Sequence, residues 1–124
     1  MEANENRIQL GESEYRFACL IWAHQPVSSG KLVELAGESL GWKKSTTYTV
    51  LKKLCEKGLF QNLDATVTAL IPREKVQRQE SRQFVDRAFG GSLPGFVAAF
   101  LSDRTLSAQE AEELKRLIDS HKEG

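Results

Sequence analysis

Residues 43–60, KKSTTYTVLKKLCEKGLF, combine positive charge with small hydroxyl side chains, two side-chain types that suit contact with a nucleic acid. The segment holds five lysines, although the formal net charge of the 124-residue chain is zero. Hydroxyl groups can donate or accept hydrogen bonds at base edges, and lysines can reach phosphates. A neutral chain that binds nucleic acid must do so through a local cluster of this kind.

A helix from residue 44 or 45 to about residue 57 divides this segment into two faces. The inner face holds mostly apolar positions: Thr47, Val50, Leu51, Leu54 and Gly58. The outer face begins with hydroxyls and becomes basic: Ser45, Thr46, Thr49, Lys52, Lys53 and Glu56, with Tyr48 and Cys55 on a flank. Short side chains at the N-terminal end favour entry into a major groove, with lysines on the neighbouring phosphates. The alternative is a solvated amphipathic helix whose lysines only keep the protein soluble.

Two further helices are expected before this one. Apolar residues at helical spacing predict a helix that begins after Gly11 and ends near His24, before Pro26. A second helix begins at Ser28-Ser29 and is closed by Gly41. The two serines could hold a phosphate with their hydroxyls and the free N–H groups of the helix, or they could simply cap it. Three short helices with tight connections indicate a helix-turn-helix arrangement.

Residues 59–72 have the pattern of a β-hairpin. Two β-rich runs, 59–63 and 66–71, flank Asp64-Ala65 as a turn, and Pro72 ends the second run. A hairpin directly after a helix-turn-helix is a wing. Because this stretch contains no Lys or Arg, we expect the wing to contribute little to DNA affinity.

The chain returns to helical periodicity after Arg73. Gly90-Gly91 interrupts the pattern, and Ser107 with Glu110 forms a capping box before the last apolar stripe. The predicted fold class is mainly α with a small β-hairpin. We expect a flexible N-terminal arm over 1–10, a winged helix-turn-helix over 11–72, and a three-helix dimerisation region over 73–124.

Several classes of protein are disfavoured. No apolar run approaches the ~20 residues of a membrane span, and the N-terminus lacks the apolar core of a secretory signal, so we expect a cytoplasmic protein without membrane insertion. Cys19 and Cys55 lack CxxC spacing, and both histidines are isolated, which predicts no metal site and no cofactor. We also expect no catalytic residues and no enzyme activity, because phosphate-loop, GxSxG and HExxH motifs are absent.

The order and spacing of short motifs resemble a known family over about residues 10–118. The motifs are Leu10 with Glu14, Ile21-Trp22, Gly41-Trp42, Thr46…Thr49…Leu51…Lys53-Leu54…Lys57-Gly58, Glu80-Ser81…Phe84-Val85, Phe89-Gly90-Gly91-Ser92-Leu93, Val97-Ala98-Ala99-Phe100 and Leu106-Ser107…Glu110…Glu113-Leu114…Leu117-Ile118. This pattern resembles the penicillinase repressor (BlaI/MecI-type) family of winged-helix transcriptional regulators. Lys43-Lys44 stand where the family often has Ser-Pro, which makes Ser45 a candidate helix cap.

The resemblance implies a homodimeric repressor that binds a palindromic DNA operator and controls antibiotic-resistance or related stress genes. It implies groove-facing roles for Ser45, Thr46, Tyr48, Thr49 and Lys53. Together with the charge and capping arguments, the predicted DNA-binding residues are Ser28, Ser29, Lys44, Ser45, Thr46, Tyr48, Thr49, Lys52 and Lys53. A membrane sensor protease is an implied partner, and Ala99-Phe100 matches the bond, Asn-Phe in some members, that such a protease cleaves. The chain lacks the C-terminal cysteine cluster of the copper-responsive branch, which argues against copper sensing.

Four of the six phenylalanines lie beyond the wing. A helical extension of ~50 residues cannot bury them well alone, whereas a symmetric copy could. The predicted dimer interface is Phe84, Phe89, Phe96, Val97, Phe100, Leu101, Leu114, Leu117 and Ile118. The alternative is that these helices fold back onto a monomeric core. An alternative function is a winged-helix module for protein–protein contact without specific DNA binding.

Overall fold

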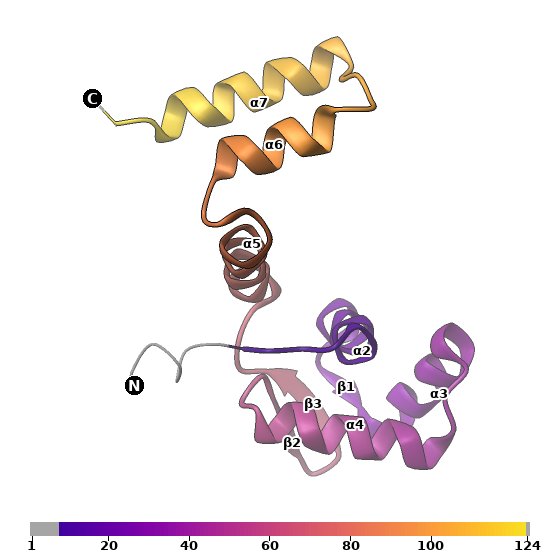
Figure 1. The fold of residues 1–124 in the computed structure, drawn as a ribbon. Helices are drawn as coiled ribbons and strands as arrows, with labels where there is room; N and C mark the ends of the chain where they lie inside the picture. The colour runs from indigo at the N-terminus through magenta and orange to yellow at the C-terminus, as the bar shows by residue number, and fades with distance from the viewer. Residues whose placement is uncertain (1–7, 124) are drawn as a thin grey trace. The chain divides into compact units, whose positions relative to one another are not determined.

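The computed structural model describes residues 8–123, which divide into two compact units with their boundary between Arg82 and Gln83 (Figure 1). The elements in chain order are α2 (Glu12–His24), β1 (Val27–Ser28), α3 (Ser29–Leu40), α4 (Lys44–Glu56), β2 (Phe60–Leu63), β3 (Thr66–Ala69), α5 (Arg73–Phe89), α6 (Leu93–Leu101) and α7 (Ala108–His121). The predicted fold class is confirmed, because helices dominate the described residues and the strands form one small antiparallel sheet.

Local signals at the helix ends act as the sequence predicts. The Lys31 N–H donates to the Ser28 hydroxyl at 3.0 Å, so Ser28 caps α3, and Gly41 ends that helix with φ 71°. Gly58 ends the α4 region with φ 85°. A positive φ in this range suits glycine, because glycine has no Cβ that would clash with the backbone. The capping box of α7 is also confirmed, since the Glu110 N–H donates to the Ser107 hydroxyl at 3.0 Å.

The start of α4 differs from the expectation. Lys43 occupies the N-cap position in extended backbone and makes no side-chain capping bond. Ser45 lies inside the first turn, where its carbonyl accepts a hydrogen bond from the Thr49 hydroxyl at 2.9 Å. Ser45 as the helix cap is therefore wrong. The Ser45 hydroxyl is therefore not used to cap the helix and can take part in a binding surface.

The sheet has the strand order β1-β3-β2, and both pairings are antiparallel. The hairpin of β2 and β3 confirms the predicted wing. Asp64 and Ala65 form its turn with φ values of 51° and 63°, the pair of positive angles that matches the twist of a two-residue hairpin. The sequence analysis missed β1, in which Val27 pairs with Val67.

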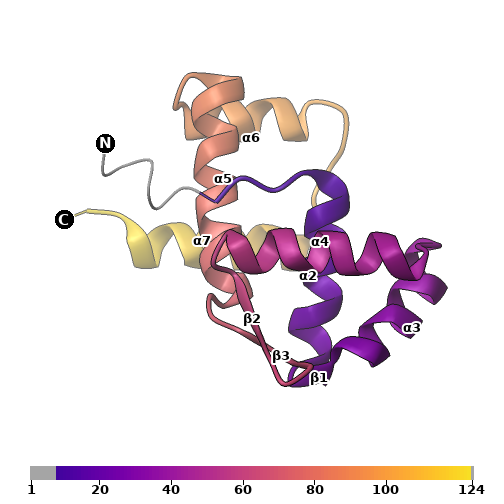
Figure 2. The same cartoon turned by 90° about the horizontal axis from the view of Figure 1, so that it is seen from below.

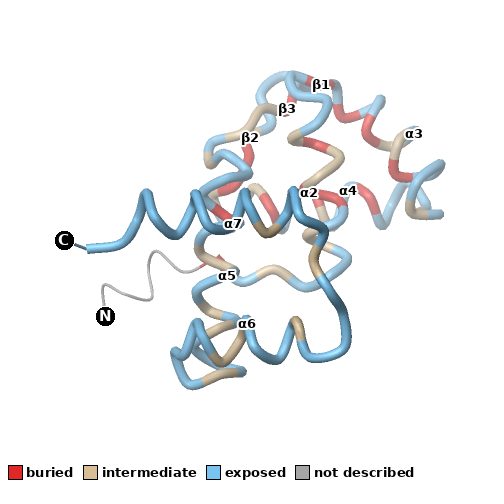
Figure 3. The backbone as a smooth tube through the Cα atoms, turned by 90° about the horizontal axis from the view of Figure 1, so that it is seen from above, coloured by how far each residue is buried: buried red, intermediate tan, exposed pale blue. Residues whose placement is uncertain are grey.

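The first unit contains the hydrophobic core, with Phe17, Ile21, Leu32, Leu54 and Phe60 at 0–1% exposure. Figure 3 shows these buried positions along α2, α3, α4 and the strands. The Trp22 indole N–H donates to the carbonyl of Ile71 at 3.0 Å, and Trp22 is half-buried. The core therefore fixes α4 against α2 and α3 and leaves the other side of α4 open.

The predicted flexible arm over residues 1–10 lies partly outside the described residues, which begin at Ile8. Ile8 itself is buried, with 8% exposure, and its N–H donates to Oε1 of Gln79 in α5 at 3.0 Å. Ile8 packs with the hydrophobic core. Ile8 is therefore held against the core, because burial of an apolar side chain is favourable. The flexible arm over residues 1–10 stays a prediction.

The second unit has a different character. Phe84, Phe89, Phe96 and Phe100 form a chain of ring contacts with centroid separations of 5.5–6.0 Å. The Arg104 guanidinium lies 4.5 Å from the centre of the Phe100 ring. Of the described residues in this unit, none is fully buried. The aromatic side chains touch one another and still leave much of their surface open to solvent.

Candidate nucleic-acid interface

Helix α4 has the two faces that the sequence predicts. Thr47, Leu51 and Leu54 are buried against the core, with 0–2% exposure. Figure 2 looks onto this helix, with α2 passing behind it. The predicted outer residues Ser45, Thr46, Thr49, Lys52 and Lys53 are all exposed. They form one continuous polar surface, hereafter the outer face of α4, and the core does not cover it.

The threonine hydroxyls of α4 are partly committed to the helix. The Thr49 hydroxyl donates to the carbonyl of Ser45 at 2.9 Å, and the Thr47 hydroxyl donates to the carbonyl of Lys43 at 3.1 Å. A hydroxyl whose proton is used in this way keeps its lone pairs. Thr49 therefore offers an acceptor and a methyl group to its surroundings, which suits the amino group of cytosine or adenine and the methyl group of thymine.

Four of the five lysines in the segment are available for an external partner. Lys43, Lys44, Lys52 and Lys53 are exposed, and within residues 8–123 none of them forms an ion pair. Lys57 differs, because its ammonium lies 2.8 Å from Oε1 of Glu14. The outer face of α4 therefore carries positive charge that the first unit does not neutralise by direct pairing.

Tyr48 lies on the flank of this surface, as the helical wheel predicts. Its side chain is 38% exposed, so the ring can contact a ligand beside the outer face. An aromatic ring cannot neutralise a phosphate, but it can pack against a sugar or a base methyl group.

The two serines at the start of α3 have different roles. Ser28 is exposed and caps the helix. Ser29 is buried, with 7% exposure, and its N–H donates to the carbonyl of Ala65 at 2.9 Å. The N–H of Ser29 is therefore not free for a phosphate, and Ser29 as a direct DNA contact is corrected to a residue that joins α3 to the wing. Ser28 stays a candidate contact.

The tip of the wing is exposed and lacks basic side chains. Leu63 is 61% exposed, and Asp64 and Ala65 are also exposed. Asp64 would approach the phosphates with a negative charge, which is unfavourable. A small contribution of the wing to DNA affinity stays a prediction on these grounds.

The residues predicted for a dimer interface are apolar and largely exposed in the second unit. Exposures are 43% for Phe84, 41% for Val97, 49% for Phe100, 43% for Leu114, 56% for Leu117 and 63% for Ile118. Phe89, Phe96 and Leu101 are half-buried. Exposed apolar side chains in such number usually mark an interaction surface.

The candidate proteolytic bond Ala99-Phe100 lies inside α6, and both residues are exposed. The Ala99 carbonyl accepts hydrogen bonds from the N–H of Ser102 at 3.3 Å and from its hydroxyl at 2.9 Å. A helical peptide bond must unwind before a protease can bind it in extended form. Cleavage at this bond stays a prediction.

No other chemistry is prominent among the described residues. Burial and, to a lesser extent, the charge of Glu56 raise the pKa of the half-buried Cys55 thiol, which lowers the fraction present as the reactive thiolate. Cys19 and Cys55 are free thiols, and residues 8–123 contain no cluster of three or more metal-ligating side chains. Within the same range, no helix has the length and apolar character that crossing a membrane requires.

Comparison with known proteins finds one family profile that matches most of the chain and relatives named as repressors or regulators. The sequence profile of the penicillinase repressor family matches residues 10–120. The chain is 26% identical over 118 residues to the penicillinase repressor of Bacillus licheniformis, a match that covers 92% of each chain. It is 22% identical over 115 residues to the methicillin resistance regulatory protein MecI of Staphylococcus aureus (strain Mu50), which covers 90% of this chain and 94% of the relative. A penicillinase repressor of Staphylococcus aureus is 18% identical, with 91% of this chain covered.

Proposed function

This chain belongs to the penicillinase repressor family, and we propose from that premise that it is a DNA-binding transcriptional repressor. The family match extends from residue 10 to residue 120, so it includes both the winged helix and the C-terminal helices. Two of the relatives described above are named as penicillinase repressors, and a third is named as a regulator of methicillin resistance.

The outer face of α4 is the observation that carries the proposal. Its hydroxyl-bearing N-terminal end enters a major groove, where Thr46 and Thr49 contact base edges. Lys44, Lys52 and Lys53 bind the phosphates beside the groove, and their lack of ion-pair partners within residues 8–123 leaves their charge for this purpose. Leu51 and Leu54 are buried in the core on the hydrophobic side of the same helix, so the outer face stays turned towards solvent.

The repressor acts as a homodimer in this proposal. The second unit exposes Phe100, Leu117 and Ile118, and none of its described residues is fully buried. A second copy of the chain covers this surface by two-fold symmetry and removes apolar area from water, at about 25 cal/mol per Å². A two-fold dimer presents two copies of α4, which predicts a palindromic operator with half-sites about one or more helical turns apart.

In this proposal the protein acts in the cytoplasm of a bacterium, where its binding at an operator blocks transcription. The regulated genes are antibiotic-resistance or related stress genes. Release involves a membrane sensor protease acting at Ala99-Phe100. Because α6 holds this bond in a helix, cleavage follows local opening of α6, and loss of the aromatic surface then separates the protomers.

The test is a titration of the full-length protein against a duplex from its own upstream region and against a random duplex, at several salt concentrations. Preference for the upstream duplex, with a two-fold symmetric footprint, is expected. Affinity should fall with salt by a slope of about −0.9 for each neutralised phosphate. Equal affinity for both duplexes even at low salt would contradict the proposed repressor function and favour a role in protein–protein contact.

A further inference from the structure

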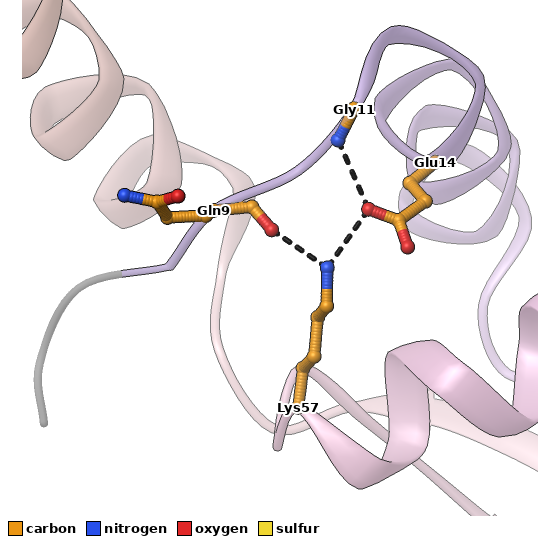
Figure 4. Close-up of polar contacts among 4 residues, drawn as sticks. All are labelled: Gln9, Gly11, Glu14 and Lys57. Atoms are coloured by element: carbon orange, nitrogen blue, oxygen red, sulfur yellow. Dashed lines mark hydrogen bonds and ion pairs between the residues drawn. The ribbon is translucent and has the colours of Figure 1, made fainter.

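The ammonium group of Lys57 joins three segments of the first unit (Figure 4). It donates to the carbonyl oxygen of Gln9 at 2.7 Å and to Oε1 of Glu14 at 2.8 Å. The same Glu14 oxygen accepts a hydrogen bond from the Gly11 N–H at 2.9 Å. One cation thus links the C-terminal end of α4, the first turn of α2 and the segment that precedes α2.

The Lys57 ammonium is internally satisfied. The Glu14 and Lys57 side chains are 19% and 37% exposed, so the pair is partly shielded from water. The hydrogen bond from Lys57 is the main reason that the pKa of Glu14 lies below its usual value; burial opposes this shift, and the hydrogen bond from the Gly11 N–H and the charges of Lys57 and Lys53 add to it. In this respect Lys57 differs from Lys52 and Lys53, which have no ion-pair partner in the described part of the chain.

The segment before α2 is itself anchored. Ile8 is buried and bonded through its N–H to Gln79 of α5, while Gln9 binds Lys57. Residues 8–11 therefore form a strap between α5 and the end of α4. A change in the position of residues 8–11 would therefore alter the contacts that hold the C-terminal end of α4.

Because of the position of Lys57, a small change in its contacts can displace the opposite end of α4. Lys57 is the C-cap of α4, and the hydroxyl residues lie at the opposite end of this 13-residue helix. At ~1.5 Å per residue the helix is roughly 20 Å long, so a tilt of about 5° at Lys57 moves the first turn by roughly 1.7 Å. Bidentate or methyl contacts with base edges do not survive a displacement of that size.

We propose that Lys57 and Glu14 are specificity-determining positioning residues, which hold the end of α4 so that its first turns meet the base edges in one orientation. Neither residue touches DNA. This inference rests on the proposed DNA-binding function. It separates two lysines of one helix into different roles, with Lys53 on a phosphate and Lys57 in an internal support.

The decisive comparison is Lys57→Met against Lys53→Met, because both variants lose one positive charge from the same helix. Each is titrated against the operator duplex and a random duplex at several salt concentrations. Lys57→Met is expected to reduce the preference for the operator roughly threefold to tenfold while the salt slope stays unchanged. Lys53→Met is expected to lower affinity for both duplexes and to reduce the slope by about 0.9.

Glu14→Gln separates the two roles by the preference for the operator. If Lys57 bound a phosphate, removal of its internal partner would raise affinity for operator and random duplexes alike and leave the preference unchanged. The positioning role instead predicts a lower preference for the operator, of the same size as in Lys57→Met. The double variant should lose no more preference than either single variant, because both changes break one interaction. Lys57→Arg should retain the preference, and Lys122→Met, which breaks a surface ion pair with Asp119 at the C-terminal end of α7, should leave it unchanged.

The inference is overturned if Lys57→Met loses equal affinity on both duplexes with a shallower slope, or if neither single variant changes the preference. A measurement without DNA tests the support directly. The Gly58 and Leu59 amides donate to Cys55 and Leu54 at the end of α4, and their hydrogen exchange should become faster in Lys57→Met. Unchanged exchange at both amides would also overturn it. Lack of operator preference in the wild-type protein would refute the proposed function, and the exchange result would still decide the role of Lys57.

Discussion

The N–H of Ser29 donates to the carbonyl of Ala65 at 2.9 Å, and this bond joins the first residue of α3 to the turn of the wing. The pairing of β1 with β3 brings the two residues together, because Ser28 lies opposite Thr66. Ser29 is buried as a result. The helix-turn-helix and the wing are therefore connected at this point, and the geometry of the turn matters for the start of α3.

Ala65 occupies this turn with φ 63°, a left-handed conformation that costs a residue with a Cβ about 1–2 kcal/mol. Ala65→Gly removes that cost and adds a smaller entropic one in the unfolded state. We expect the variant to be more stable by about 0.5 kcal/mol in urea unfolding. Ala98→Gly in α6 is the matched control, since the same change within an exposed helix should destabilise by about 0.5–1 kcal/mol. Loss of stability in Ala65→Gly would show that the turn is not left-handed in solution.

The pair of Glu14 and Lys57 predicts a contribution to stability that depends on pH. The pKa of Glu14 is lowered in the folded protein, chiefly by the hydrogen bond from Lys57, so its contribution is present above the ordinary pKa of 4.5 and is lost as pH falls through the folded value. Because Lys57 is 37% exposed, solvent weakens the pair, and we expect about 0.5 kcal/mol. Glu14→Gln should lower the free energy of unfolding by that amount at pH 7 and by less at a pH below the folded pKa of Glu14. An equal difference at both pH values would assign the loss to packing rather than to charge.

Local signals explain why much of the fold follows from sequence. Ser28, Gly41 and Gly58 act on their own helix ends, and the alternation of buried and exposed positions along α4 needs only its own residues. The outer face of α4 was predictable for the same reason. A helical wheel identifies which side chains share a face without knowledge of the rest of the chain.

Contacts between distant segments explain what the sequence did not reveal. The strand β1 has two residues and exists because Val27 meets Val67. The bond between Lys57 and Glu14 joins residues 43 positions apart. Both residues belong to motifs of the family resemblance, but nothing in the sequence indicates that they contact each other. The burial of Ser29 has the same origin, since it depends on the wing turn. From side-chain type alone, Lys57 and Ser29 are expected at the surface. Tertiary packing instead pairs Lys57 with Glu14 and buries Ser29 beside the wing turn.

Lys53 is predicted to contact a phosphate. Lys53→Ala should weaken binding to operator and random duplexes by the same factor and reduce the magnitude of the salt slope by about 0.9, because one fewer counterion is released. Binding titrations at several salt concentrations measure both quantities. Glu56→Gln on the same helix is the control, since it keeps every lysine and should leave the slope unchanged. A selective loss on the operator alone would mean that Lys53 contacts a base.

Thr49 is predicted to contribute to sequence preference. Its hydroxyl proton is used by the Ser45 carbonyl, so the methyl group and the oxygen lone pairs face the ligand. Thr49→Ala should change the ranking of operator variants by about 1–3 kcal/mol at one base pair and leave affinity for random duplex nearly unchanged. The matched variants Thr49→Val and Thr49→Ser separate the methyl from the hydroxyl. A uniform loss on all duplexes would place Thr49 on the backbone instead.

Phe100 is predicted to lie in the interface between two copies of the chain. Its side chain is 49% exposed in the protomer and touches Phe96 and Arg104, so a polar replacement leaves most of the protomer's contacts intact. Across a symmetric interface, Phe100→Asp would bury two unpaired carboxylates, which is strongly unfavourable. We therefore expect this variant to sediment as a monomer with a folded first unit.

Loss of the dimer also predicts the effect on DNA. A monomer binds one half-site at a time, so operator affinity should fall by about 10²–10⁴, the gain that a second linked site provides. Leu63→Asp is the matched control for the sedimentation measurement, because Leu63 is 61% exposed on the wing and the variant should stay dimeric. A stable dimer of Phe100→Asp in sedimentation equilibrium would remove Phe100 from the interface. Monomers with unchanged operator affinity would instead show that dimerisation is not needed for binding.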